Sequence, residues 1–313
     1  MNKSHFKAKL FDKTATVILY ISAIFFILLL LAMTLYIVIQ GLNAIMPGLI
    51  TFSGDFPFVS FYTPSSFAPE MLGFFGDGIG IQFFNTVYLV TVALIVSVPI
   101  GILAGIYMAE YSKPGPFTSI IRTCIETLSS LPSIVVGLFA FLIFVELTHM
   151  QYNMLAGSGA VSILSIPLIA RVTEDAIRDV PDGHREGSYS LGATKWQTIV
   201  RVLFPTAIPR IITGIILAAG RGFGEAAALI YTAGMTSDVN FNNWNIMDIN
   251  SPLNPFRQCD TLAVHIWAIK AEGSDYLQKY ANLSAATLVI MVLLFNIGSR
   301  LIGRLIEKRI QGK

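Results

Sequence analysis

The chain has 313 residues, of which 54% are hydrophobic and only 13% are charged. Soluble domains carry about 25% charged residues, so this composition excludes an ordinary soluble protein and indicates one that lies in a lipid bilayer. The net charge of +2 selects no partner and gives no reason to expect a nucleic acid, so the positions of the charges carry the information.

The first long apolar run extends from Thr14 to Ile39 and follows four lysines. A helix needs about 20 apolar residues to cross a hydrocarbon core of ~30 Å. The run is about twice as long as the apolar region of a signal peptide, and no small-residue cleavage site follows it. We therefore expect a retained first span with its N-terminus in the cytoplasm. Residues 40–80 contain no Lys or Arg and are expected to form an external loop.

Further runs without frequent charges predict five more spans. They are Gly78–Ala109, Thr127–Val145, Leu147–Ala170, Ile211–Ser237 and Tyr280–Ser299. All are much longer than the ~10-residue strands of a membrane barrel. The sequence therefore predicts an all-α membrane protein with six transmembrane helices.

The basic residues orient these spans, because Lys and Arg concentrate in cytoplasmic segments. The N-terminal tail and residues 110–126, 171–210 and 300–313 hold 17 of the 21 basic residues. Both termini are then cytoplasmic, and the loops 40–80 and 234–282 are external. Within the second loop we expect an interfacial helix around Thr261–Ala271, with Trp244 and Trp267 at headgroup level.

The two cysteines give no sign of redox or metal chemistry. This topology puts Cys124 at the cytoplasmic end of a span and Cys259 outside, so a disulfide between them would have to cross much of the bilayer. Cys/His pairs with metal-ligand spacing are absent from the sequence, so we expect neither a metal site nor a cofactor.

Two ionisable residues interrupt the fifth run. Arg221 and Glu225 lie four residues apart, which would put them on one face of a continuous helix. At 1.5 Å per residue, Arg221 is about 24 Å from Pro205, near the midplane or slightly beyond it. An ionisable group there should face protein or water. One interpretation is an Arg that meets an anion while Glu225 holds it; the other is an ion pair that only packs the bundle.

Arg122 and Glu126 repeat this spacing where the third run begins. Positive charge is expected near the cytoplasmic face, so a snorkelling Arg paired to its neighbour is the simpler interpretation. A second anion contact near the inner mouth is the alternative.

The polar insert 171–210 separates the fourth and fifth runs. Asp182 is a candidate N-cap for a short helix, and Gly192 suits a left-handed position at its C-terminal end. Thr194 and Gln197 have the spacing of a capping box that opens a second helix. Two short helices around a glycine bend are predicted. From these residues alone, the insert either lies on lipid or docks on a partner.

An energy source is missing from the sequence. The chain lacks a Gly-x4-Gly-Lys-[Ser/Thr] phosphate loop. Moving an anion into a negative-inside cell costs about 2.3 kcal/mol per charge per 100 mV. Concentrative anion uptake would therefore need ion coupling or a separate ATPase.

The insert resembles the coupling motif of ABC-importer permeases, which reads Glu-Ala-Ala, then Gly four positions later, then Ile-x-Leu-Pro. The corresponding residues are Glu186-Gly187-Ser188, Gly192, and Val202-Leu203-Phe204-Pro205. The spacing matches fully, and the replacements are small for small and apolar for apolar. On this resemblance the ATPase-coupling residues would be Arg185, Glu186, Gly187, Ser188, Gly192, Trp196 and Pro205.

Several stretches resemble the permeases of bacterial phosphate uptake systems, nearer the PstA type than the PstC type. They are IGILAGIYMAEY from Ile100, LPSIVVGLF from Leu131, LGATKWQTIVRVLFP from Leu191, GRGFGEAAALIYTAG from Gly220, and LAVHIWAIKAEG from Leu262. The resemblance covers residues 80–310 and implies a type I ABC importer permease. Residues 1–80 would be the first helix and external loop, and 81–310 the permease domain that carries the insert.

The resemblance implies a transport subunit that is not itself an enzyme, in the bacterial inner membrane. It would form the path for inorganic phosphate with a PstC-like permease, receive phosphate from a PstS-like external binding protein, and bind a PstB-like ATPase dimer. By their place in the segment, Arg221 and Glu225 would line the substrate path; Arg122, from its own position, is the candidate for a further anion contact at the inner mouth. The alternatives are a permease for sulfate or molybdate, and a self-contained ion-coupled transporter.

Overall fold

The computed structural model describes residues 3–44, 79–237, 239–241, 243–273 and 275–310, and within these ranges the chain forms helices, turns and loops without a strand. Five of the described helices are long and apolar enough to cross a membrane. A sixth candidate span consists of two helices joined at a sharp bend. The prediction of an all-α membrane protein is confirmed.

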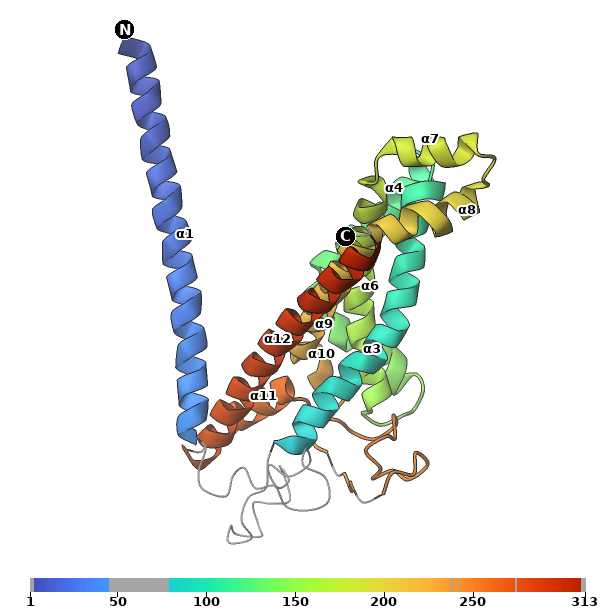
Figure 1. Cartoon of the computed structure of the whole chain (residues 1–313). Helices are drawn as coiled ribbons and strands as arrows, with labels where there is room; N and C mark the ends of the chain where they lie inside the picture. The colour runs from blue at the N-terminus through green and yellow to red at the C-terminus, as the bar shows by residue number, and fades with distance from the viewer. Residues whose placement is uncertain (1–2, 45–78, 238, 242, 274, 311–313) are drawn as a thin grey trace.

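The first helix, α1 (Lys3–Ala44), contacts the last helix, α12 (Asp275–Ile310), near the end of α1, and the two helices diverge toward the other side of the molecule (Figure 1). At this contact a Cβ on Gly41 would lie 2.1 Å from the Cβ of Ala286, so glycine sets the distance between the two helices. None of the apolar window of α1 is buried. Its side chains are therefore left for lipid or for another chain.

The centre of the molecule is formed by α3 (Gly80–Ile106), α6 (Met154–Arg178) and α9 (Phe204–Phe223). The hydroxyls of Ser158 and Ser162 on α6 donate to the carbonyls of Leu89 and Ala93 on α3, at 3.2 and 2.9 Å. Small residues and hydroxyl hydrogen bonds are the usual means by which membrane helices pack closely. The last turn of α3 continues as a π-helix, η1 (Tyr107–Tyr111).

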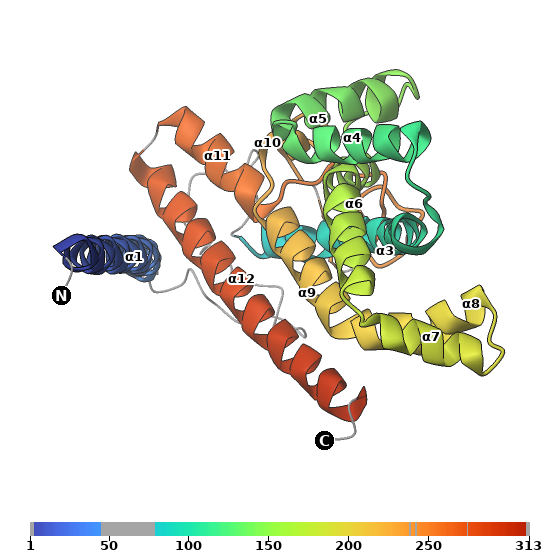
Figure 2. The same ribbon diagram turned by 90° about the horizontal axis from the view of Figure 1, so that it is seen from above.

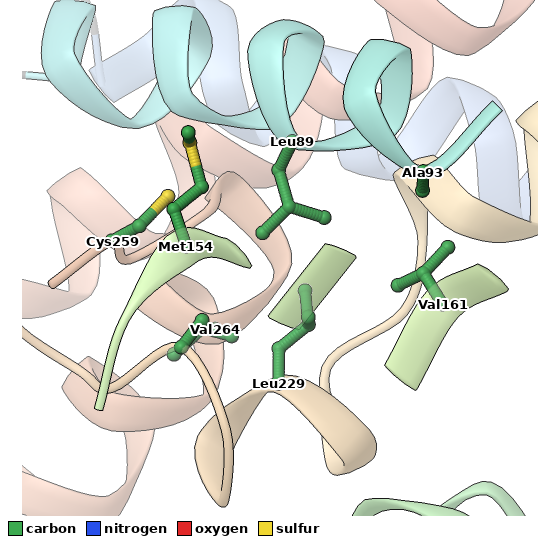
Figure 3. Packing of buried hydrophobic residues seen from close by; sticks show 8 residues of the cluster. Leu89, Ala93, Met154, Val161, Leu229, Cys259 and Val264 are labelled. Carbon is green, nitrogen blue, oxygen red and sulfur yellow. The ribbon is translucent and has the colours of Figure 1, made fainter. Parts of the chain in front are cut away.

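A buried apolar cluster lies toward the external end of this bundle. It joins α3 and α6 to α10 (Ala227–Ile230) and α11 (Leu262–Glu272), as Figure 3 shows. Its labelled members are Leu89, Ala93, Met154, Val161, Leu229, Cys259 and Val264. Cys259 is buried here and Cys124 is exposed, and both are free, so the prediction of no disulfide is confirmed.

The predicted third, fourth and fifth spans have the wrong limits. The fifth, expected at Ile211–Ser237, is instead the helical segment Lys195–Phe223, which begins inside the insert. The run Thr127–Val145 is divided between α4 (Pro116–Ser130) and α5 (Ser133–Phe141), which continues as η2 (Leu142–Glu146), and the two parts meet at 103°. Pro132 lies at the break; it has no N–H to donate and forces the preceding residue out of the helical region. The next helix, α6, begins at Met154 and not at Leu147. Figure 2 shows α4 and α5 on one flank of α6.

The insert forms α7 (Asp182–Ser190), α8 (Lys195–Thr198) and the π-helix η3 (Ile199–Leu203). It lies at the end of the molecule that also holds the N-terminal end of α1 (Figure 1). The described part of 231–273 lies at the opposite end. This is the arrangement that the positive-inside rule predicts. Most of the loop 40–80 falls outside the described residues.

The helix expected around Thr261–Ala271 is present as α11. Thr261 caps it, accepting a bond from the N–H of Val264 at 3.4 Å. Its first turn is buried and it packs along α12. Trp267 is half-exposed on its outer side.

Candidate functional site

The insert has the local geometry that its sequence predicts. Gly192 takes φ +79°, a left-handed conformation, at the bend between α7 and α8. Thr194 and Gln197 form a complete capping box at the start of α8. The expected cap at Asp182 is wrong, because Pro181 occupies the N-cap and Asp182 instead accepts a bond from Arg185 in the first turn.

The predicted coupling residues divide into an outer and an inner group. Glu186, Gly187, Gly192 and Trp196 are exposed on the insert. Ser188 is half-buried and its hydroxyl lies 2.9 Å from that of Thr198, which fastens α7 to α8. Pro205 lies in the first turn of α9 and is also half-buried.

Arg185 faces inward. Its guanidinium reaches Oε1 of Glu110 in η1 at 3.0 and 3.1 Å, and it also donates to the carbonyls of Ile177 and Val180. The side chain of Arg185 is 16% exposed and that of Glu110 is 8% exposed. Lys195, on the other side of the bend, donates to the backbone carbonyl of Glu110 and lies over the ring of Tyr111. Sequence reasoning did not identify Glu110.

An apolar base supports these polar contacts. Buried side chains from the ends of α3 and α6 pack against the start of η3 and α9. They are Ile106, Ala176, Ile177, Val180, Ile199, Leu203, Ala207 and Ile211. The part of the insert that leads into α9 is therefore anchored on a buried core.

Arg221 and Glu225 are not a helical ion pair, so the expectation that Glu225 holds Arg221 is wrong. The helix α9 ends at Phe223 with Gly224 as its C-cap, so no helical turn joins Arg221 to Glu225. Glu225 is buried and its carboxylate accepts a bond from the N–H of Ala228 at 3.1 Å, at the start of α10. Arg221 is exposed on the chain, and within the described residues it forms no ion pair or hydrogen bond.

The level of Arg221 in the bundle follows from its neighbour. A Cβ on Gly222 would meet Val161 of α6 at 3.3 Å and Val90 of α3 at 3.4 Å. Both valines lie within their spans and not at the ends. Arg221 therefore lies level with the interior of the α3 and α6 spans, two residues before its own helix ends at Phe223, and its depth in the membrane stays a prediction.

Arg122 also departs from its expected partner. It binds Glu174 of α6 at 2.5 Å, while Glu126 binds Arg171 at 3.4 Å. These ion pairs connect α4 to α6 around a cavity of about 120 Å³. The cavity is lined by the charged residues Arg122, Glu126, Arg171, Glu174, Asp175 and Arg178.

A buried polar network at the external end was not predicted. Arg257 is 2% exposed and donates to Asn85 Oδ1 at 2.6 Å. Asp260, also 2% exposed, accepts from Gln82 at 2.9 Å and from Ser237 at 2.5 Å. Burial lowers the pKa of Arg257, and the Asp260 carboxylate opposes this shift. The available signal was the spacing of Gln82 and Asn85, which share one face of an otherwise apolar helix.

Comparison with known proteins agrees with this architecture. The methionine ABC transporter MetNI, in an inward-facing form, contains a chain that aligns with 77% of this one at a TM-score of 0.57 and 18% identity, covering 99% of that chain. The fold is that of a type I ABC importer permease. The family described as "Binding-protein-dependent transport system inner membrane component" matches residues 101–312.

Two curated relatives extend the match. The probable ABC transporter permease YqgI of Bacillus subtilis is 43% identical over 96% of this chain and 98% of its own length. The phosphate transport system permease PstA of Mycobacterium leprae is 33% identical over 71% of this chain and 69% of its own. The chain therefore belongs to the family of binding-protein-dependent transport system inner membrane components. It is a multi-pass transport subunit of the inner membrane and not an enzyme.

Proposed function

We propose that this chain is a permease subunit of an ATP-driven importer of inorganic phosphate and forms the translocation path with a second, PstC-like permease. Family membership sets aside the alternative of a self-contained ion-coupled transporter. Because uptake against the membrane potential requires energy and the sequence carries no nucleotide loop, a PstB-like ATPase dimer supplies it. A PstS-like external protein delivers phosphate.

The observation that carries this proposal is Arg221. A guanidinium at membrane depth costs at least about 2.5–3.5 kcal/mol to insert and is found facing protein or water, not lipid. Arg221 is exposed on the isolated chain and has no carboxylate partner within the described residues. This face therefore meets protein or water, and a second permease subunit would enclose a water-filled path against it. The cation, unneutralised by its own chain, is then available to an anion in the path between the subunits.

The other candidate residues take places along the same path. Glu225 lies just beyond Arg221, buried at the turn into α10. Arg122 lies at the cytoplasmic end, where the charged cavity between α4 and α6 provides an inner mouth. The relatives named for phosphate transport support phosphate as the anion. A permease for sulfate or molybdate would use the same cation, so the assay must compare these anions.

The insert docks on the ATPase through its exposed residues. Glu186, Gly187, Gly192 and Trp196 form the outward surface. Arg185 and Ser188 hold that surface in place, and Pro205 lies in the first turn of α9, which follows it. An exposed Trp beside polar groups suits a protein interface. The motif spacing from Glu186 to Pro205 and the family match over residues 101–312 favour docking over lying on lipid.

The test is phosphate uptake by the Arg221→Gln variant in cells or vesicles that contain the whole transporter. We expect uptake to be abolished while the amount of assembled complex is unchanged, because only the charge is removed. Lys270→Gln, which removes an exposed cation from α11, is the matched control and should transport normally. Normal uptake by Arg221→Gln would refute the anion path. Uptake of sulfate in preference to phosphate would show that the proposed substrate is wrong.

A further inference from the structure

We propose that α3 carries the coupling between the two faces of the membrane, with Glu110 as the positioning residue at its inner end and Asn85 at its outer end. The inference rests on the proposed function, in which ATP is used inside and substrate is delivered outside. Such a machine requires that the two faces influence each other.

The inner end of α3 is tied to both limbs of the insert by one residue. Glu110 binds Arg185, in α7 before the Gly192 bend, and also contacts Lys195, in α8 after it. Lys195 additionally covers the ring of Tyr111, at 4.9 Å from its centroid. A movement of either limb is therefore transmitted to η1, the end of α3, although α3 is not adjacent to the insert in the sequence.

The charge on Glu110 makes this contact directional. The side chain of Glu110 is 8% exposed. Loss of its partner would leave a buried charge uncompensated, which strongly destabilises a protein. The apolar contacts of Ile106 with the insert permit sliding, because dispersion has no preferred direction. The ion pairs fix the position of the insert on α3, whereas the apolar base supplies only adhesion.

The outer end of α3 is tied to the external segment by Asn85, which is fully buried. Its Oδ1 accepts from Arg257 at 2.6 Å, and its amide group donates to Ser237 at 2.8 Å and to the carbonyl of Asp260 at 3.0 Å. Each hydrogen-bonding group of this side chain is occupied. Gln82, one turn earlier, adds a bond to Asp260 at 2.9 Å.

Between these ties the helix is unbroken. The helical segment Gly80–Tyr111 includes Pro99 without an interruption. The 25 residues from Asn85 to Glu110 correspond to about 38 Å at 1.5 Å per residue, which is more than the ~30 Å hydrocarbon core. Figure 1 shows α3 running from the external segment to the insert. A helix held at both ends by buried polar contacts is suited to transmit displacement between them.

The experiment measures how strongly phosphate-loaded external binding protein stimulates ATP hydrolysis in the purified, reconstituted complex. The ratio with and without binding protein is compared for the wild type, Glu110→Gln, Asn85→Ala and the double variant. We expect each single variant to reduce stimulation at least about fivefold, the lower end of the usual coupling between two sites. Because both residues act on one helix, the double variant should fall no further than the lower single variant.

Glu146→Gln is the matched control, since Glu146 is an exposed acid on η2, outside α3 and both ties. Its stimulation should equal that of the wild type. Undiminished stimulation in Glu110→Gln or Asn85→Ala, or losses that multiply in the double variant, would overturn the role of α3. A wild-type complex without stimulation would instead refute the proposed function and the coupling role with it.

Assembly is controlled by measuring only complexes that co-purify in equal subunit ratio. Where a buried variant does not assemble, a milder one replaces it: Lys195→Met at the inner tie, or Gln82→Leu at the outer tie. Each removes one arm of a contact that retains other bonds. We expect about a threefold loss of stimulation, near the lower end of the coupling free energies seen along such networks. An unchanged ratio in these variants would also overturn the proposal.

Discussion

Gly192 is constrained by backbone conformation and not by space. Its φ is +79°, and no atom lies within 4 Å of a Cβ built on it. A valine there must adopt a left-handed conformation that costs about 1–2 kcal/mol even for less branched residues. Gly192→Val should change the angle between α7 and α8 and reduce the phosphate transported per ATP hydrolysed, while docking of the external binding protein remains intact.

The matched control for this variant is Gly183→Val. Gly183 also lies in the insert with open space around it, but its φ is not positive. Transport and ATP hydrolysis by the control should stay proportional, as in the wild type. If Gly192→Val were equally well coupled, the insert would be better explained as a helix that lies on lipid.

At the scale of single residues, the features that depend on a few sequence neighbours could be predicted. The bend at Gly192 and the capping box of Thr194 and Gln197 arise from local backbone chemistry, and the structure confirms both. The pairing of Arg221 with Glu225 failed because it assumed that a helix continues through Gly224. Where a helix ends inside a bundle depends on packing, which the spacing of two charges does not contain.

At the scale of elements, the close approach of α3 to α6 determines the stability of the bundle. A Cβ on Gly105 would lie 2.5 Å from the carbonyl oxygen of Ala170 and 2.5 Å from Cβ of Thr173. Neither atom is the movable end of a long side chain. Gly105→Val should therefore force the helices apart and destabilise the purified chain in detergent by about 1–3 kcal/mol, the usual cost of overpacking.

Thermal unfolding of the detergent-solubilised chain measures this loss. Gly298→Val provides the comparison, because Gly298 is also helical but no atom lies within 4 Å of its would-be Cβ. The control should unfold at the wild-type temperature. Equal unfolding temperatures for both variants would mean that α3 and α6 do not pack as closely as described.

The limits of the elements show what apolar runs can and cannot predict. Runs of sufficient length locate α1, α3 and α12 because burial in lipid is a property of composition. The bend between α4 and α5 is not visible as a loss of hydropathy. Pro132 gave a local sign of it, but a proline within a span can also be tolerated as a mild kink. The packing of α5 against α6 and α10 distinguishes a sharp bend from a mild kink, and hydropathy does not contain this packing.

For the whole molecule, topology could be predicted but long-range polar contacts could not. The distribution of Lys and Arg predicted which segments share an end of the molecule, because it depends on composition, and the structure places the insert and the start of α1 together at one end. The external polar network joins residues that are far apart in the sequence. Asn85 and Arg257, for example, are separated by 172 positions. No periodicity in a single sequence connects such residues. The same limit explains why Glu110 was not recognised as the partner of Arg185.

The two faces can be distinguished by labelling single cysteines in a Cys124→Ser background. Leu191 in the insert is 90% exposed and Met247 in the external segment is 87% exposed. The native Cys259 should not react, because it is fully buried and burial raises its pKa to about 12; at neutral pH it remains a thiol, and the thiolate is the reactive form. A membrane-impermeant maleimide added outside should label Met247→Cys and not Leu191→Cys.

Inverted vesicles should give the reverse result, and they add a test of docking. Vesicles without the ATPase should label Leu191→Cys, and addition of the ATPase should slow that labelling because the bend at Gly192 is then covered. Labelling of Leu191→Cys from outside would contradict the topology. If Leu191→Cys is labelled from inside and the bound ATPase does not slow the labelling, the topology is supported. The docking surface must then lie elsewhere on the cytoplasmic face.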